Sequence, residues 1–319
     1  MGKLSFYGTL EEKLPHFNQG AITHYRIDNA SQFEGWYQVM KTTISNEPPF
    51  ANFFRGVTEA RYKLYNSAQR FWIRNNLQEI EALQQSLSYI DMVQKMVNNA
   101  KKVKLLQQVF EYYDLLDEQR DFPLLSILQH YAAPTPLMDW TYDLDVALFF
   151  AIDGLRPSEK GNTIDDYISV YRVNKVKEYS FMKNNLQFIS GNIFPTVKGL
   201  AGYLADTSVV YISDFELAGH EDKQQRKIKP LTTYYNLNIL AQKGLFIFNP
   251  NDSRPLEDFA DLYPAEPDGR IFCYNISKDL AEFIKYRIGS EQIEPGFIYP
   301  ELKLYAKSIL DDYLKYVIG

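Results

Sequence analysis

Residues 129–152 read QHYAAPTPLMDWTYDLDVALFFAI and carry the strongest structural signals of the chain. Residues 144–152 are apolar almost without interruption, which is typical of a helix that is buried on all sides. Asp143 precedes this helix and is a residue type that caps helix N-termini. Pro134 and Pro136 favour an extended or turned backbone and stiffen the segment before it. We therefore predict a rigid loop, rich in polar groups, that leads into a buried helix.

Outward from this stretch, short segments of β character are interspersed with helical ones. Runs of aromatic or β-branched residues near turn residues predict strands at residues 50–57, 167–173, 208–213, 244–248 and 270–276. Apolar spacing and capping residues predict further helices at residues 31–40, 124–131 and 278–288, and from residue 300 onward. Because strands and helices are partly segregated, we predict an α+β fold with a mixed or antiparallel sheet and packed helices.

The most helical region covers residues 71–120, which contain neither Gly nor Pro. Apolar residues recur there at spacings of three and four, which indicates an amphipathic helix, and a second helix is expected at residues 103–118. We predict that residues 71–120 form a helical insertion, packed on one side of a single domain that covers residues 1–319.

Composition argues against several classes of protein. The chain is 45% hydrophobic and 23% charged, which is ordinary for a packed globular protein. A net charge of -6 supplies no clear basic surface for nucleic acid. One Cys excludes an internal disulfide, and four widely separated His residues argue against a metal site, so no metal is expected. No leader or membrane-spanning run is visible, so we expect a cytoplasmic protein without membrane contact.

Common catalytic motifs are missing from the sequence, including the Walker A loop, G-x-G-x-x-G, H-E-x-x-H and G-x-S-x-G. One candidate site begins at Phe54-Arg55-Gly56, at the end of an aromatic strand. The Arg55 guanidinium is always charged, so it must meet solvent, a carboxylate or an anionic ligand. Gly56 would allow a ligand or another backbone segment to approach closely. A structural Arg–Asp ion pair is the alternative.

Two further segments present polar groups. In the first, residues 129–141, Asp139 is expected to orient His130 or to pair with Arg55. The alternative is a capping loop in which Asp139 and Thr141 bond backbone N–H groups. In the second, Gln242 precedes an apolar strand, either at the edge of a cleft or in an ordinary turn.

Together these segments resemble the FRG-domain family. Its Phe-Arg-Gly signature is matched by Phe54-Arg55-Gly56, and its motif, roughly Q-H-Y-G-L-P-T-R-L-L-D-W-T before A-L-F-F-A, is matched by residues 129–141 and 147–151. Matching positions extend from about residue 50 to residue 302. The chain departs from the family pattern at Ala133, Pro136 and Asn238, where Gly, Arg and Arg are usual, so part of any anion-binding capacity of its relatives is lost.

The resemblance implies a fold more directly than a function. FRG domains occur in bacterial and phage-associated proteins, which implies a defence or toxin system. The order of the three segments is similar to that of some ADP-ribosyltransferases, so we expect an ADP-ribosyltransferase-like or NAD-cleaving site with NAD as substrate. Arg55 would hold the pyrophosphate, with Gly56 allowing the ligand to approach. His130 or Thr141 would bind the ribose, and Tyr131 or Trp140 the nicotinamide. Gln242 or Asp139 would orient the acceptor or stabilise an oxocarbenium-like centre.

Two other functions fit the same residues. A non-catalytic module would bind a nucleotide or a phosphorylated ligand through Arg55. A hydrolase or nuclease would use His130 and Asp139, although neither a basic surface nor a set of metal ligands supports it. The sequence identifies no protein partner.

Overall fold

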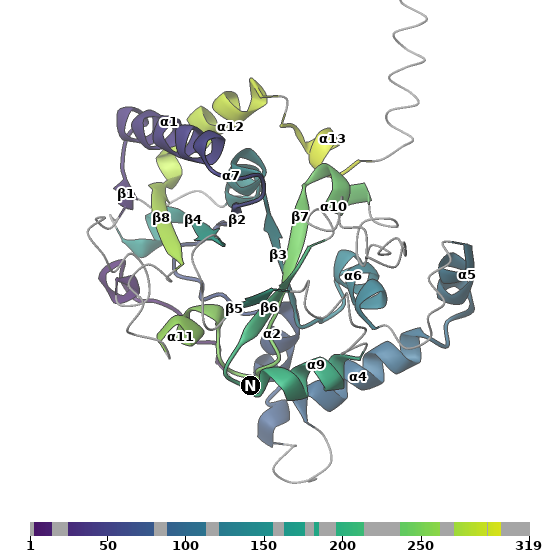
Figure 1. Ribbon diagram of the computed structural model, residues 1–319. Helices are drawn as coiled ribbons and strands as arrows, with labels where there is room; N and C mark the ends of the chain where they lie inside the picture. Colours follow the sequence, from purple (N-terminus) through teal and green to yellow (C-terminus); the bar gives the residue numbers. More distant parts are fainter. Residues whose placement is uncertain are drawn as a thin grey trace, which may run out of the picture.

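The computed structural model describes residues 3–14, 25–79, 88–112, 121–155, 163–175, 182–184, 196–213, 237–261, 271–291 and 293–300. Within these ranges an eight-stranded sheet has the order β1-β8-β4-β2-β3-β7-β6-β5 (Figure 1). The strands are β1 (Tyr25–Ile27), β2 (Asn52–Val57), β3 (Leu137–Thr141), β4 (Tyr167–Asn174), β5 (Met182–Asn184), β6 (Val209–Ile212), β7 (Gly244–Phe248) and β8 (Phe272–Ser277). The β1–β8 and β5–β6 pairs are parallel and the others antiparallel. The predicted α+β fold with a mixed sheet is confirmed.

Helices pack around this sheet. The longer ones are α1 (Ala30–Asn46), α2 (Ser67–Arg74), α4 (Tyr89–Ala100), α5 (Lys104–Tyr112), α6 (Phe122–His130), α7 (Leu144–Ile152), α9 (Val197–Leu204) and α12 (Ala281–Gly289). The short ones are η1 (Glu11–Lys13), η2 (Ile164–Asp166), α10 (Leu237–Ala241), α11 (Leu256–Asp261), η3 (Lys278–Leu280) and α13 (Pro295–Ile298). None of the helices within the described ranges is both long and apolar enough to cross a membrane.

Alternating strand residues divide the core into a continuous layer on one face of the sheet and two separate clusters on the other. Phe53, Trp140 and Tyr171 belong to the continuous layer. On the opposite face, Phe54 packs under α1, α7 and α12, whereas Phe246 packs in a second cluster with α2, α4, α6 and α9. Figure 1 shows these two helical groups over different halves of the sheet. The period of two along each strand produces this division.

Most predicted elements are present within a few residues, and α7 begins and ends at the predicted positions. The prediction for the segment before α7 was partly wrong, because Leu137–Thr141 form strand β3 between β2 and β7 rather than a loop. Pro134 and Pro136 precede this strand, so they remove no donor from its ladder. The helix predicted from residue 300 onward lies outside the described residues.

The region predicted as a helical insertion contributes to the core where it is described. The α4 side chains of Tyr89, Val93 and Val97 are buried and belong to the same cluster as Phe246 on β7. α4 packs directly against α9 and α6. Residues 80–87 and 113–120 lie outside the described residues, and the insertion itself stays a prediction.

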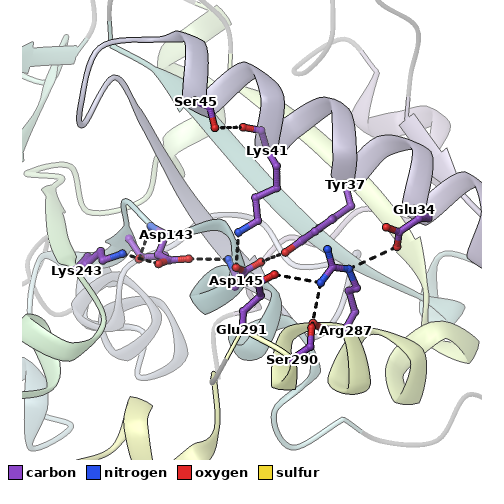
Figure 2. A network of polar contacts seen from close by, with 11 residues as sticks. Glu34, Tyr37, Lys41, Ser45, Asp143, Asp145, Lys243, Arg287, Ser290 and Glu291 are labelled. Atoms are coloured by element: carbon purple, nitrogen blue, oxygen red, sulfur yellow. Dashed lines mark hydrogen bonds and ion pairs between the residues drawn. The ribbon is translucent and has the colours of Figure 1, made fainter.

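A polar network fixes the start of α7 against two other helices (Figure 2). The buried Asp145 carboxylate accepts hydrogen bonds from Tyr37 Oη at 2.7 Å and Lys41 Nζ at 2.5 Å, both on α1. Asp143 caps α7 by accepting from the backbone N–H of Asp145, and it pairs with Lys243 at 2.8 Å. Arg287 on α12 lies over the Tyr37 ring. These contacts hold α1, α7, α12 and the residue before β7 in one arrangement.

Gly56 allows α7 to lie directly on β2. A Cβ atom at Gly56 would lie 1.8 Å from the carbonyl oxygen of Ala147 and 2.7 Å from the backbone nitrogen of Ala151. Both atoms belong to the α7 backbone, which cannot move aside as a flexible side chain would. Of the two roles expected for Gly56, close approach of another backbone segment is therefore the one that the fold uses.

Substitution of Gly56 tests this close approach. Gly56→Ala forces α7 away from the sheet, so the free energy of unfolding in urea should fall by about 3 kcal/mol or more. Gly35→Ala is the matched control, because Gly35 lies in α1 with no atom near the added Cβ. That variant should be as stable as the wild type or about 1 kcal/mol more stable. Equal stability of both variants would contradict the packing role.

Candidate active site

The sheet is divided at its centre, between β2 and β3. In the described structure these neighbours share a single registered pair, Phe54 with Thr141. By contrast, β2 pairs with β4 along its whole length, and β3 does so with β7. The two halves of the sheet therefore separate beyond that pair, and a cavity of about 370 Å³ lies beside the separation.

The cavity gathers polar and aromatic side chains from distant parts of the sequence. Its lining includes the polar residues Arg55, Thr58, Gln129, His130, Asp139, Thr141, Asn238 and Gln242. Its apolar wall includes Phe54, Phe150, Ile239, Phe246 and Tyr299. Seven of the eight residues predicted for the site line this cavity, namely Arg55, Gly56, His130, Asp139, Trp140, Thr141 and Gln242. Tyr131 does not line it; its side chain is 76% exposed and packs edge-on against His130.

Arg55 spans the separation between the two strands. Its Nη1 donates to the backbone carbonyl oxygen of Asp139, while its Nε is buried without a hydrogen-bond partner in the described structure. No carboxylate of the described residues lies within ion-pair distance of this guanidinium. Burial lowers the pKa of Arg55, and the nearby Asp139 charge opposes that effect. Among the described residues, the structural Arg–Asp ion pair considered as the alternative is therefore not formed.

The Asp139 carboxylate has a partner that was not predicted. Its Oδ2 accepts a hydrogen bond from Gln129 Nε2 at 2.8 Å. His130, the last residue of α6, instead lies 3.2 Å from the side-chain nitrogen of Asn238 through Nδ1. Asp139 therefore neither orients His130 nor pairs with Arg55, and both expectations were wrong. Gln129 lies inside the quoted motif, but a neutral amide beside a His gave no signal that distinguished it.

Two further residues predicted to bind a ligand have their side chains engaged by the protein. The indole of Trp140 is only 3% exposed and packs edge-on against Phe53, with ring centroids 5.4 Å apart, in the layer on the far face of the sheet. Thr141 Oγ1 donates to the carbonyl oxygen of Gln242 at 2.5 Å and accepts from the backbone N–H of Asp143 at 2.9 Å. Strand alternation turns Trp140 inward, and the turn before α7 uses the Thr141 hydroxyl.

Gln242 and Tyr299 close one side of the cavity. Gln242 Nε2 donates to the carbonyl oxygen of Ile298 in α13 at 3.0 Å. The Tyr299 hydroxyl donates to Asp153 at 2.8 Å, and its ring lies edge-on to Phe149 and Phe150 at the end of α7. Phe150 lies within the matched motif at residues 147–151, yet neither it nor Tyr299 was predicted for the site, because tertiary contacts alone bring them to the cavity.

Positive charge accumulates near the strand separation. Arg70 on α2 donates to the carbonyl oxygen of Tyr65 at 2.6 Å. Burial lowers the pKa of Arg70 to about 10, and the neighbouring Arg55 charge contributes to that shift. Asp139 is the one acidic residue in the cavity lining described here. Among the described residues, no group of three His, Cys, Asp or Glu side chains is arranged to hold a metal ion.

Residues 51–160 match the model of one protein family, the FRG domain. This segment includes Arg55, Gln129, His130 and Asp139, and it agrees with the resemblance found in the sequence. No curated protein and no solved structure matches the chain.

The environment of Arg55 predicts the effect of its removal on stability. Because Arg55 is half-buried, with one backbone partner among the described residues and a buried, unbonded Nε, its charge costs free energy. Arg55→Met should therefore unfold with a free energy equal to that of the wild type or up to about 2 kcal/mol greater. Arg172→Met is the control. Arg172 lies on the neighbouring strand β4 and is bonded to Asn52 at 2.7 Å and Glu47 at 3.4 Å. Its removal should cost about 1.5–3 kcal/mol in chemical denaturation. A larger loss for Arg55→Met than for Arg172→Met would show that Arg55 is structural.

Proposed function

We propose that the cavity of this chain, whose residues 51–160 match the FRG-domain family model, binds NAD or a related nucleotide and cleaves the bond between nicotinamide and ribose. The observation that carries the proposal is the half-buried Arg55 at the cavity, whose Nε is buried without a hydrogen-bond partner in the described structure. A folded protein retains a poorly compensated buried charge chiefly where function requires it.

Arg55 fits the role of a phosphate ligand. A guanidinium has five N–H groups and binds two phosphate oxygens at once. In the part of the chain that the structure describes, its acceptor is the carbonyl oxygen of Asp139, which leaves other N–H groups available for a ligand. The charge of Arg70 nearby adds to the attraction for an anion.

The remaining lining suits a ribose and a flat ring. Phe150, Phe246 and Tyr299 supply aromatic surface for the nicotinamide, in place of the predicted Trp140 and Tyr131. A volume of about 370 Å³ lies at the lower end of small-molecule sites. We infer that the nicotinamide, its ribose and one phosphate occupy the cavity, while the adenosine half extends beyond it.

Asp139 is the carboxylate that this reaction requires. When the bond between ribose C1′ and nicotinamide N1 breaks, its electron pair goes to the nicotinamide nitrogen and leaves positive charge on the ribose. The Asp139 carboxylate stabilises that charge. Water then bonds to C1′ and releases a proton to solvent, which gives ADP-ribose and nicotinamide. An acceptor side chain in place of water would make the protein an ADP-ribosyltransferase. The setting that we propose is a bacterial defence or toxin system.

A non-catalytic nucleotide-binding module is the second candidate. Two side chains that were expected to contact the substrate are instead hydrogen-bonded to the protein, which favours binding without catalysis. The Gln242 amide is bonded to Ile298 and the Thr141 hydroxyl to Gln242. A hydrolase or nuclease that uses a His130–Asp139 pair has less support, because Asp139 is bonded to Gln129 and His130 to Asn238.

Binding and turnover with NAD separate these functions. NAD and ADP-ribose should raise the melting temperature of the wild type by several degrees, and Arg55→Met should abolish that shift. Asp139→Asn should retain the shift, whereas its rate of nicotinamide release, followed by chromatography, should fall by about 100-fold or more. Asp165→Asn is the matched control, because Asp165 is exposed and paired with Arg61.

Each outcome of this experiment decides between the candidates. A shift without nicotinamide release by the wild type would favour the binding module. No shift with either ligand would contradict the proposed NAD site. Equal release by Asp139→Asn and Asp165→Asn would remove Asp139 from the reaction.

A further inference from the structure

Gln129 connects the Asp139 carboxylate to the rest of the fold. It lies in the last turn of α6, and its Nε2 donates to Asp139 Oδ2 at 2.8 Å across to β3. Within the part of the chain that the structure describes, this is the hydrogen bond that the carboxylate receives, and Oδ1 is left for another partner.

The orientation of the Gln129 amide is determined by its other end. The Thr135 hydroxyl accepts from the backbone N–H of Leu137 at 3.3 Å and donates its proton to Gln129 Oε1. The Gln129 oxygen is therefore engaged as an acceptor, and its NH₂ group must face Asp139. The reverse orientation would place an amide oxygen against a carboxylate oxygen, where neither atom has a proton to donate.

The support for Gln129 is itself buried. Thr135 is completely buried, and its backbone N–H donates to Ser67 Oγ at 2.9 Å, at the start of α2. Ser67 Oγ also lies 3.3 Å from Gln129 Oε1. Three elements, α2, α6 and the segment before β3, thus fix the amide, so that it holds the carboxylate in one rotamer.

We infer that Gln129 is a positioning residue for the proposed reaction. It binds Oδ2 of Asp139 and thereby leaves Oδ1 to stabilise the charge that develops on the ribose. The inference rests on the proposed function, because it assigns Gln129 a role in the reaction that Asp139 would perform.

Gln129→Glu tests this role through its pH dependence. At pH 5, a carboxyl group at position 129 that holds a proton can donate it to Asp139 as the amide does. At pH 8, two ionised carboxylates in contact repel each other and displace Asp139. Relative to the wild type, kcat for nicotinamide release should be within about threefold at pH 5 and at least about tenfold lower at pH 8. KM should change less than kcat, because Arg55 and the aromatic wall are unaltered.

The chain offers a chemically matched control in Gln94→Glu. Gln94 on α4 donates from Nε2 to Asp121 Oδ2 at 2.9 Å, and neither residue lines the cavity. This variant should lose stability as pH rises, yet its kcat should follow that of the wild type over the whole range. Gln129→Met, which keeps the size of the side chain but donates no hydrogen bond, should lower kcat at both pH values. All assays are run below the melting temperature measured for each variant at the same pH.

The possible results separate two kinds of failure. If the wild type releases nicotinamide and Gln129→Glu follows its pH profile, Gln129 does not position Asp139, although the proposed function stands. A kcat that falls equally with pH in Gln94→Glu would assign the effect to stability and overturn the inference. If the wild type releases no nicotinamide, the cleavage reaction and the inference both fail.

Discussion

Strands β2 and β3 lie side by side at the centre of the sheet, yet in the described structure they pair only through Phe54 and Thr141. This constraint determines the position of the cavity, because the strands separate beyond that pair. Arg55 follows Phe54 on β2 and Asp139 precedes Thr141 on β3, so both residues lie at the separation. The helices repeat the division: α1, α7 and α12 cover one half of the sheet, and α2, α4, α6 and α9 cover the other. The cavity therefore lies where two separately packed halves meet, a position at which small-molecule sites often occur.

Helix α7 packs closely on β2 at one side of this division, whereas Arg55 at its centre has unused hydrogen-bond donors in the described structure. Gly56 brings the α7 backbone directly against β2, and the buried Asp145 carboxylate ties α7 to α1. Only one residue away from Gly56, the half-buried Arg55 has a single backbone acceptor among the described residues, and its Nε is buried without a partner there. The rigid packing of α7 supplies the stability that lets the fold retain this unfavourable group. In the function that we propose, a site organised in this way would bind the phosphate of its ligand without a cost of reordering.

The polar side chains around the cavity differ in how many of their hydrogen-bond donors and acceptors are already bonded to the protein. Thr141 and Gln242 are bonded to the protein, and these bonds connect the starts of α7 and β7 with α13. Asp139 keeps one oxygen available while Gln129 holds the other. Arg55 keeps several donors without a partner among the described residues. The chemistry that this arrangement supports therefore needs one cationic group and one carboxylate, which is consistent with cleavage of a positively charged glycosidic bond beside a phosphate.

The sequence by itself determined the fold class, the buried helix α7 and the group of residues that would meet at one site. These follow from local patterns, since apolar periodicity, capping residues and the Phe-Arg-Gly and Asp-Trp-Thr motifs are readable along the chain. Tertiary structure alone decided how the side chains are used. It placed Trp140 in the core, bonded Asp139 to Gln129 instead of His130, and brought Phe150 and Tyr299 to the cavity. The physical reason is that hydrogen-bond partners and strand separation depend on distances between elements far apart in the sequence, which no local pattern encodes.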